Sequence, residues 1–200
     1  MDMKEIALRS VAAAGLSLFV LKAYVYYAAT GELPVLLLLC GESLTVVLVI
    51  CARAPHTRAM DPLSAVLTFC ATYYFLLINL EPGAALAPPA VGIALQVTGI
   101  VLQIFAKLVL GRSFGLLPAN RGVVTRGPYR VVRHPIYLGY LITHIGYLLY
   151  SFTAANVLLF TGLYLLQAGR ILREENVLCR DEGYMRYATV VRWRMLPGIF

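Results

Sequence analysis

The sequence predicts an all-α polytopic membrane protein with about six transmembrane helices. Of its 200 residues, 60% are hydrophobic and only 14% are charged, whereas soluble domains carry about 25% charged residues. The apolar residues gather in runs that are long enough to cross a bilayer as helices. The basic residues gather in alternate connections between these runs. One multispanning membrane domain is therefore expected.

The apolar runs are separated by residues that break helices or carry charge. Gly31 and Pro34 end the first run, and the proline-rich segment 81–89 ends the third. Residues 151–155 form a turn that is short enough to make the last two runs an antiparallel helical hairpin. The six expected transmembrane helices are residues 6–28, 35–52, 62–80, 90–110, 135–150 and 154–170.

The basic residues predict how these helices are oriented. Sixteen of the 17 Lys and Arg residues lie in the N-terminal segment or in residues 53–61, 107–133 and 170–200. The positive-inside rule then places both termini in the cytoplasm. A five-helix alternative would put the basic connection and the basic tail on opposite faces of the membrane. The net charge of +7 is thus explained by membrane topology, and we expect no nucleic-acid partner.

Two charged residues lie inside the first two expected helices, namely Lys22 and Glu42. Charges within a membrane are costly and are usually paired or functional. Pairing of Lys22 with Glu42, or extension of Lys22 towards the membrane surface, is the simpler expectation. The alternative is that Glu42 lines a substrate cavity.

The four cysteines, at positions 40, 51, 70 and 179, show neither zinc-site spacing nor the pattern of a disulfide framework. Three of them lie within or at the ends of expected helices, where cysteine usually behaves as a small apolar residue. We therefore expect no metal and no disulfides.

The stretch 121–139, RGVVTRGPYRVVRHPIYLG, carries the strongest local signal. Gly127 and Pro128 interrupt the chain, and His134 and Pro135 then begin the next apolar run. Proline is well suited to the first position of a helix. The start of a helix attracts anions, so a helix that begins at Pro135 is a candidate site for a carboxylate or phosphate. A basic cytoplasmic loop without a ligand is the simpler interpretation.

The order of residues from Gly127 to Gly139, G-P-Y-R-x-V-R-H-P-x-Y-x-G, resembles the signature of the isoprenylcysteine carboxyl methyltransferase and phospholipid methyltransferase superfamily. Members of that superfamily are integral-membrane enzymes that use S-adenosylmethionine. The resemblance implies a methyl-donor pocket on the cytoplasmic side, formed by the C-terminal half of the chain. The sequence has no GxGxxG fingerprint of a dinucleotide-binding domain.

A second cluster, R-I-L-R-E-E at residues 170–175, fits the same resemblance. Arg170 and Glu174 are four residues apart and share one helix face. By themselves they would be typical of a charge-paired, solvated helix end. Superfamily members have two acidic residues here, followed by a leucine, two tyrosines and a late proline. The corresponding residues are Glu174, Glu175, Leu178, Tyr184, Tyr187 and Pro197, with a shorter segment before Tyr184 than in the family.

The resemblance covers residues 101–200, so we expect this half to be methyltransferase-like and residues 1–100 to form a transmembrane scaffold with the acceptor groove. It implies that Arg170 meets the acceptor and that Glu174 binds the cofactor, as the catalytic pair. Both clusters are then expected to converge, with Tyr137 close to Glu174. The residues expected at the cofactor are Arg121, Gly122, Val123, Val124, Tyr129, His134, Pro135, Ile136, Tyr137, Glu174 and Glu175.

The acceptor is expected to be lipophilic, either a prenylated molecule or a membrane lipid. A carboxylate is already a nucleophile and needs no base, and Arg170 stands where it would orient one. An amine, as in phosphatidylethanolamine, must lose a proton, and His134, His144 and Glu175 are the candidate acceptors. His144 is more simply interpreted as a hydrogen-bonded structural residue between helices. We favour the carboxylate of an isoprenylcysteine-like acceptor.

Two other classes stay open at this point. NADPH-dependent sterol reductases have a similar C-terminal segment, and the basic stretch could bind several phosphates. The Gly127-Pro128-Tyr129 lead-in and the adjacent glutamates favour the methyltransferase. The third class is a membrane accessory protein without catalysis.

Overall fold

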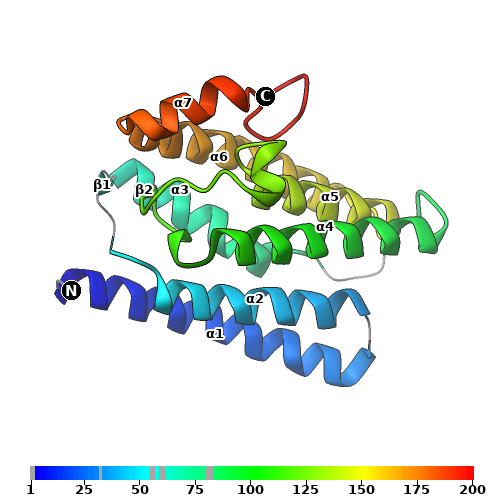
Figure 1. Ribbon diagram of the computed structural model, residues 1–200. Helices are drawn as coiled ribbons and strands as arrows, with labels where there is room; N and C mark the ends of the chain where they lie inside the picture. Colours follow the sequence, from blue (N-terminus) through cyan, green and yellow to red (C-terminus); the bar gives the residue numbers. More distant parts are fainter. Residues whose placement is uncertain (1–2, 32, 55–56, 59–61, 80–82) are drawn as a thin grey trace.

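The structure is a computed structural model, and it describes all residues except 1–2, 32, 55–56, 59–61 and 80–82. Its described part is mainly helical (Figure 1). Two-residue strands β1 (Thr57–Arg58) and β2 (Ala119–Asn120) form a small antiparallel pair. The helices are α1 (Met3–Thr30), α2 (Leu33–Cys51), α3 (Pro62–Tyr73), α4 (Pro89–Leu110), α5 (Pro135–Tyr150), α6 (Ala154–Leu178) and α7 (Glu182–Val190).

The predicted helical class is confirmed. Three helical segments are long and apolar enough to cross a membrane: Ser10–Thr30, Pro89–Ser113 and Ala154–Leu178. The apolar helices Val35–Cys51 and Pro62–Tyr73 are shorter, and α5 has 16 residues. The number of six transmembrane helices therefore stays a prediction. The last long helix continues past residue 170 without a break, as the sequence suggested.

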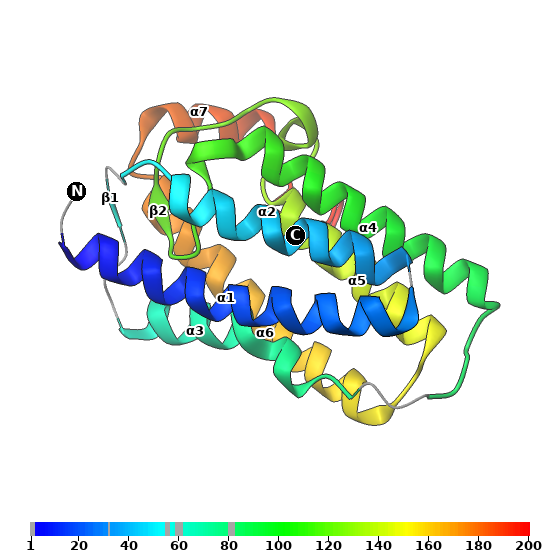
Figure 2. The same ribbon diagram turned by 90° about the horizontal axis from the view of Figure 1, so that it is seen from below.

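The helices form two groups (Figures 1 and 2). Helices α1 and α2 lie side by side as an antiparallel hairpin, and α2 packs against α4. Helix α4 packs against α5, and α3 packs against α6. The short helix α7 folds back above the C-terminal part of α6 in the view of Figure 1. The N-terminal hairpin thus reaches the rest of the protein mainly through α4.

Helices α4 and α5 are in backbone contact through two pairs of glycines. A Cβ atom on Gly99 would lie 2.6 Å from the carbonyl oxygen of Gly139, and one on Gly92 would lie 2.9 Å from that of Gly146. Small residues allow such close approach in membrane helix pairs, where lipid provides no hydrophobic driving force for association. The two pairs are seven residues apart on each helix, so they lie on one face.

Helices α5 and α6 are held together by aromatic and polar side chains along the hairpin. His144 in α5 is buried, with its two ring nitrogens 2.7 Å from the hydroxyls of Tyr74 and Tyr164. Its ring stacks on Phe160 at a centroid distance of 4.3 Å. These contacts agree with the interpretation of His144 as a structural residue. Thr153 accepts a hydrogen bond from the backbone N–H of Asn156 and so caps the start of α6.

The expected pairing of Lys22 with Glu42 is wrong. Glu42 is paired instead with Lys107, whose ammonium lies 3.2 Å from its carboxylate. Lys107 had been assigned to a basic connection, but it is in α4 and is 1% exposed. Lys22 is exposed and lines the central cavity. The ion pair joins α2 to α4, and both charges are compensated although they are buried.

The glycine contacts give a direct test of the packing. Gly99→Ala should lower the midpoint of thermal unfolding in detergent, because its methyl group would overlap backbone atoms of α5. Overpacking of this kind costs about 1–3 kcal/mol. Gly162→Ala in α6 is the matched control, since a Cβ atom there meets nothing within 4 Å. Equal midpoints for the two variants would contradict the α4–α5 contact.

Candidate active site

A cavity of about 1220 Å³ lies inside the helices and takes its lining from α1 to α7. The lining from α1 is mostly apolar, for example Leu16, Phe19 and Val25. Most of the charged lining residues, Arg121, Arg133, Arg170 and Glu174, come from residues 121–139 and the end of α6. The cavity therefore combines an apolar part with a polar end, which suits a lipophilic ligand that carries a polar group.

The connection between α4 and α5 forms part of the polar end. Its strand β2 is held by β1, and the side chain of Arg121 donates from Nε to the carbonyl of Arg53 at 3.2 Å. The Ser113 hydroxyl donates to the carbonyl of Arg121. Gly127 has φ +60°, a conformation that favours glycine. These bonds place residues 121–124 along the cavity wall.

Helix α5 begins where the sequence predicted. His134 is its N-cap residue and Pro135 its first helical residue. The backbone N–H of His134 donates to the carbonyl of Arg194 at 2.7 Å, so the C-terminal segment runs beside this helix start. The N–H groups of Tyr137 and Leu138 donate to the carbonyl of His134. An anion at this helix start stays a prediction.

The two predicted clusters meet at Tyr137 and Glu174. The Tyr137 hydroxyl donates to the Glu174 carboxylate at 3.2 Å, and the guanidinium carbon of Arg170 lies 5.5 Å from the centre of the Tyr137 ring. Arg170 is 8% exposed and donates through Nη2 to the carbonyl of Leu116. Its Nε has no hydrogen-bond partner among the described residues. The cavity wall thus contains the carboxylate of Glu174 and the buried guanidinium of Arg170, whose Nε has no hydrogen-bond partner among the described residues.

Glu175 has a different environment from Glu174. It is 5% exposed, and one carboxylate oxygen lies 2.9 Å from His134 Nε2 and accepts from the Tyr184 hydroxyl at 2.6 Å. The other oxygen pairs with Arg133 at 3.2 Å and with Arg194 at 3.7 Å. Glu175 therefore joins α6 to the start of α5, to α7 and to the C-terminal segment.

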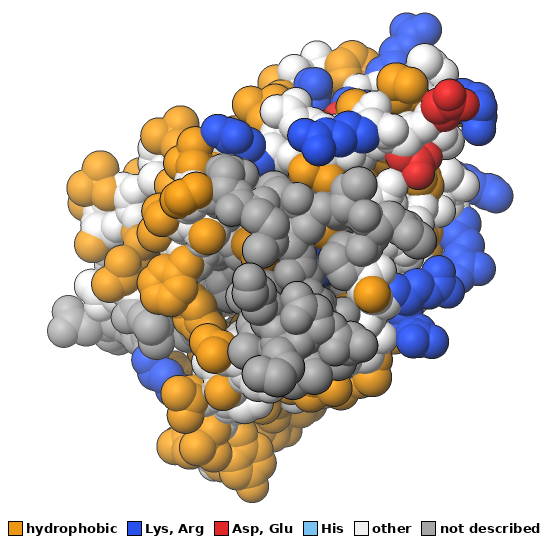
Figure 3. Space-filling model, turned by 90° about the vertical axis from the view of Figure 1, so that its left-hand side faces the viewer, with side chains coloured by type: hydrophobic (Ala, Val, Ile, Leu, Met, Phe, Trp, Pro, Cys, Tyr) orange, Lys and Arg blue, Asp and Glu red, His pale blue; other side chains and the backbone are white. Residues whose placement is uncertain are grey.

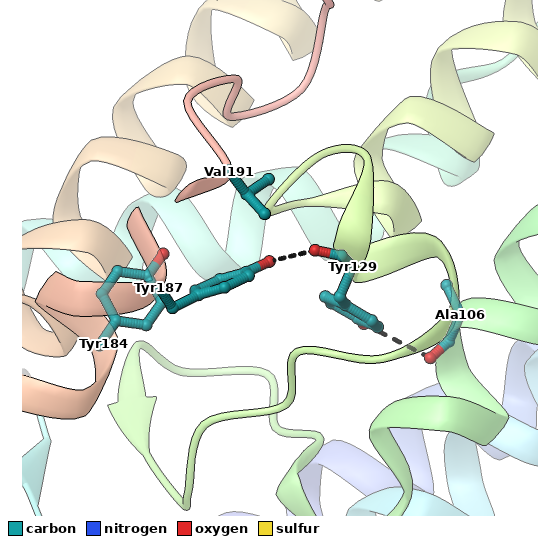
Figure 4. Close-up of a cluster of buried hydrophobic side chains, with 5 residues drawn as sticks. All are labelled: Ala106, Tyr129, Tyr184, Tyr187 and Val191. Carbon is teal, nitrogen blue, oxygen red and sulfur yellow. Dashed lines mark hydrogen bonds between the residues drawn. The ribbon is translucent and has the colours of Figure 1, made fainter. Parts of the chain in front are cut away.

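Three tyrosines of the cavity lining, Tyr129, Tyr184 and Tyr187, belong to one buried cluster (Figure 4). The Tyr187 hydroxyl donates to the carbonyl of Tyr129 at 2.6 Å, and the Tyr129 hydroxyl points to the carbonyl of Ala106 at 3.4 Å. Burial raises the pKa of Tyr129 well above its usual value. Tyr129 therefore stays neutral and presents its ring to the cavity rather than a phenolate.

Hydrogen bonds of the N-cap residue Asp181 hold the start of helix α7 in place. Asp181 caps it by accepting hydrogen bonds from the backbone N–H groups of Gly183 and Tyr184, and it accepts another from the side-chain amide of Asn120 at 3.0 Å. The bond from Asn120, followed by those from the backbone, lowers the pKa of the Asp181 carboxyl. The capping residue thus ties α7 to strand β2.

Most of the predicted site residues lie around this cavity, but two do not. Pro135 and Glu175, both expected at the cofactor, are not part of its lining. No three His, Cys, Asp or Glu side chains group as metal ligands within the part of the chain that the structure describes. The predicted residues that line the cavity are Arg121, Gly122, Val123, Val124, Tyr129, His134, Ile136, Tyr137, Arg170 and Glu174.

The sequence analysis missed several polar residues of the lining, among them Gln167, Tyr140 and Gln103. Gln167 is 2% exposed. A signal for it was present, because it is one of two amides in the apolar run 154–170 and lies three residues before Arg170 and seven before Glu174. That spacing places all three side chains on one helix face.

Two comparisons with known proteins bear on the reaction class. Residues 85–181 match the model of the phospholipid methyltransferase family. Over 60 residues, the chain is 37% identical to protein-S-isoprenylcysteine O-methyltransferase A of Arabidopsis thaliana. That match covers 28% of this chain and 30% of the plant protein, so the chain matches less than a third of its relative's length.

The matched region begins just before α4 and ends at Asp181, the N-cap residue of α7. It therefore includes both Tyr137 and Glu174. The apolar helices agree with a membrane protein. These findings confirm the resemblance found in the motif: residues 85–181 are similar to the phospholipid methyltransferase family, and a shorter stretch is similar to an isoprenylcysteine O-methyltransferase.

Proposed function

We propose that the protein transfers a methyl group from S-adenosylmethionine to the carboxylate of an isoprenylcysteine-like acceptor in the membrane. The observation that carries this proposal is the contact between Tyr137 and Glu174, 3.2 Å apart beside Arg170 in the cavity wall. Two segments that are distant in sequence thereby bring together a carboxylate, a guanidinium and an aromatic ring. The match to a methyltransferase family supports the reaction class.

The residues at the polar end fit the methyl donor. Glu174 is half-buried and lines the cavity, where it would bind the donor's ammonium group or ribose hydroxyls. The rings of Tyr129 and Tyr137 would flank the adenine or the sulfonium, the latter by a cation–π contact of about 0.5–2 kcal/mol. When bound, S-adenosylmethionine would supply an electrophilic methyl group: a carboxylate oxygen of the acceptor would form the new O–CH₃ bond while the electron pair of the broken C–S bond stays on sulfur.

Arg170 would orient the acceptor. Its guanidinium is buried, its Nε is unpartnered, and arginine binds carboxylates through paired hydrogen bonds. A carboxylate needs no general base, so the protein would act mainly by holding the two reactants in line. The apolar lining from α1 would hold the acceptor's hydrocarbon chain.

A phospholipid N-methyltransferase is the second candidate, because the matching family model carries that description. An amine acceptor must lose a proton, and the sequence offered three acceptors. His144 is held between two tyrosine hydroxyls, and His134 and Glu175 are bonded to each other. Of the two glutamates that line the cavity, Glu42 is paired with Lys107, so Glu174 would have to take the proton. The unused capacity of Arg170 favours the anionic acceptor.

We further propose that both termini and the polar end of the cavity face the cytoplasm. Figure 3 looks at the end of the molecule where β1, β2 and the start of α7 lie, and it shows Lys and Arg side chains along the upper and right-hand edges. Exposed arginines of the described residues near this end include Arg112, Arg126 and Arg180. Their position agrees with the positive-inside rule.

Ligand binding tests the reaction class. Isothermal titration of the detergent-solubilised protein should show binding of S-adenosylhomocysteine and no heat with NADPH, because the polar end offers one acid and aromatic rings to the donor. The reverse result would favour the sterol-reductase interpretation, and binding of neither would favour an accessory protein.

The two adjacent glutamates should respond differently to the same substitution. Glu174→Gln should weaken S-adenosylhomocysteine binding about tenfold or more, since hydrogen bonds to charged groups contribute about 1.5–3 kcal/mol, and it should leave the unfolding midpoint nearly unchanged. Glu175→Gln should destabilise the fold by about 3–5 kcal/mol, because it leaves Arg133 and Arg194 without a counter-charge.

Titration calorimetry and thermal unfolding measure the two effects. Glu182→Gln is the control, since Glu182 is exposed and its 3.9 Å contact with Arg186 is a surface pair. Interchanged behaviour of the Glu174 and Glu175 variants would contradict the site as described.

Substitution of the buried arginine tests the acceptor. Arg170→Lys should raise the KM for S-prenylcysteine derivatives about tenfold while the Kd of S-adenosylhomocysteine stays within a factor of two, because lysine cannot bind a carboxylate through two parallel hydrogen bonds. Methyl-ester formation and phosphatidylethanolamine methylation are measured side by side. Methylation of the phospholipid alone would identify the second candidate function instead.

A further inference from the structure

A second pocket lies at the surface, where the end of α4 meets the connection to α5. Its volume is about 380 Å³. Three arginines line it, namely Arg53, Arg112 and Arg126, and no aspartate or glutamate among the described residues does so. All three arginines are exposed. A cleft lined by charges of one sign raises the local concentration of ions of the opposite sign, so this arginine pocket should attract an anion.

Hydrogen bonds between the end of α2 and the start of the α4–α5 connection bring two of the arginines together. The backbone N–H of Arg53 donates to the carbonyl of Arg112 at 2.8 Å. Nε of Arg112 donates to the carbonyl of Cys51 at 3.2 Å, and the two Nη groups of an arginine are further donors. Nη1 of Arg53 lies 3.9 Å from the place that a Cβ atom would take on Gly122, another residue of the pocket lining. The fold thus holds Arg53 and Arg112 side by side.

The other side of the arginine pocket is apolar and continues along α4. Leu108, Val109 and Leu110, in the last turn of the helix, contribute to the pocket lining. Leu108 is also exposed, as are Phe105 and Val101, and the spacing of these three residues places them on one helix face. Because α4 is long and apolar enough to cross a membrane, this exposed stripe would contact lipid and lead from the bilayer to the pocket.

We propose that the arginine pocket binds the headgroup of an anionic phospholipid, with the phosphate among the three arginines and an acyl chain along the exposed stripe of α4. Guanidinium groups bind phosphate oxygens through paired hydrogen bonds, and basic pockets at the membrane surface bind anionic headgroups. A lipid is favoured over a free phosphate because the basic side and the apolar side adjoin in one pocket.

The arginine pocket is separate from the central cavity in its charged lining. None of its three arginines lines the cavity, and neither Arg170 nor Glu174 lines the pocket. The two share a wall that includes residues 122–124. The inference is therefore independent of the proposed methyl transfer, because it uses none of the charged residues assigned to that reaction.

The charge of the pocket predicts which headgroups it prefers. A phosphate monoester carries a charge of about −1.5 to −2 at neutral pH, so phosphatidic acid best matches three arginines. Phosphatidylglycerol has a phosphate diester with a single charge and should bind less tightly. Phosphatidylcholine has the same diester with an ammonium group attached, and the arginines would repel that group.

Lipid affinity in detergent tests the inference. The full-length protein in an uncharged detergent is titrated with phosphatidic acid, phosphatidylcholine or glycerol 3-phosphate, and bound molecules are counted by native mass spectrometry. The first phosphatidic acid should bind with a Kd about tenfold or more below that of phosphatidylcholine, because of its charge. Glycerol 3-phosphate should bind about tenfold or more weakly than phosphatidic acid, because it has no acyl chain to bury.

Substitution of the pocket arginines locates the site. Arg126→Gln should raise the Kd of phosphatidic acid about fivefold, and Arg53→Gln combined with Arg126→Gln about 25-fold, which are the effects of one and two arginines near an anionic surface. Arg180→Gln is the matched control, because Arg180 is an exposed arginine that does not line the pocket and its loss changes the net charge equally. This control should bind phosphatidic acid as the wild type does.

Three results would overturn the inference. Equal Kd values of the wild type for phosphatidic acid and phosphatidylcholine would exclude an anion site. Equal effects of Arg126→Gln and Arg180→Gln would show attraction to the basic surface as a whole and not to the pocket. Binding of glycerol 3-phosphate as tight as that of phosphatidic acid would identify a site for a free phosphate instead of a lipid.

Discussion

The carboxylate of Glu175 is the point on which the polar end of the molecule depends. It receives a histidine, a tyrosine and two arginines from three other segments. A buried charge with this many partners is stable only while all of them are in place. Because His134 begins α5 and Glu175 lies near the end of α6, the same contacts fix the register of the two helices along their axes. The positions of Tyr137 and Glu174 follow from that alignment.

The adjacent glutamates thus divide two tasks between them. A rotation of about 100° from one residue to the next on a helix directs Glu174 to the cavity and Glu175 to the protein interior behind it. One carboxylate could not perform both tasks, because the hydrogen bonds that Glu175 makes within the fold would leave it no free oxygen for a ligand. The sequence motif marks both residues without distinguishing their roles. Their surroundings make the distinction.

The sequence was sufficient where local chemistry decides the structure. The proline after His134 marks the start of α5, and the unbroken run through Arg170 predicts that α6 continues past the apolar segment. The convergence of Tyr137 and Glu174 was predicted from the resemblance and is present in the structure. The sequence did not predict pairings between residues that are far apart along the chain. Lys107 looked like part of a basic connection, and only the packing of α2 on α4 shows that it neutralises Glu42. Gln167 was not singled out, because its level in the hairpin depends on the register with α5.

The glycine pairs between α4 and α5 have a consequence for how such a protein could change its specificity. The main chains of α4 and α5 touch, so no side chains between the two helices could be exchanged for smaller ones. The space for a bulkier hydrocarbon would therefore have to come from elsewhere. The room for variation lies in the walls contributed by α1, α3 and α6, which meet the cavity through side chains of many sizes. Diversification towards longer, shorter or branched lipids would then proceed by substitutions in those three helices while the α4–α5 pair stays constant.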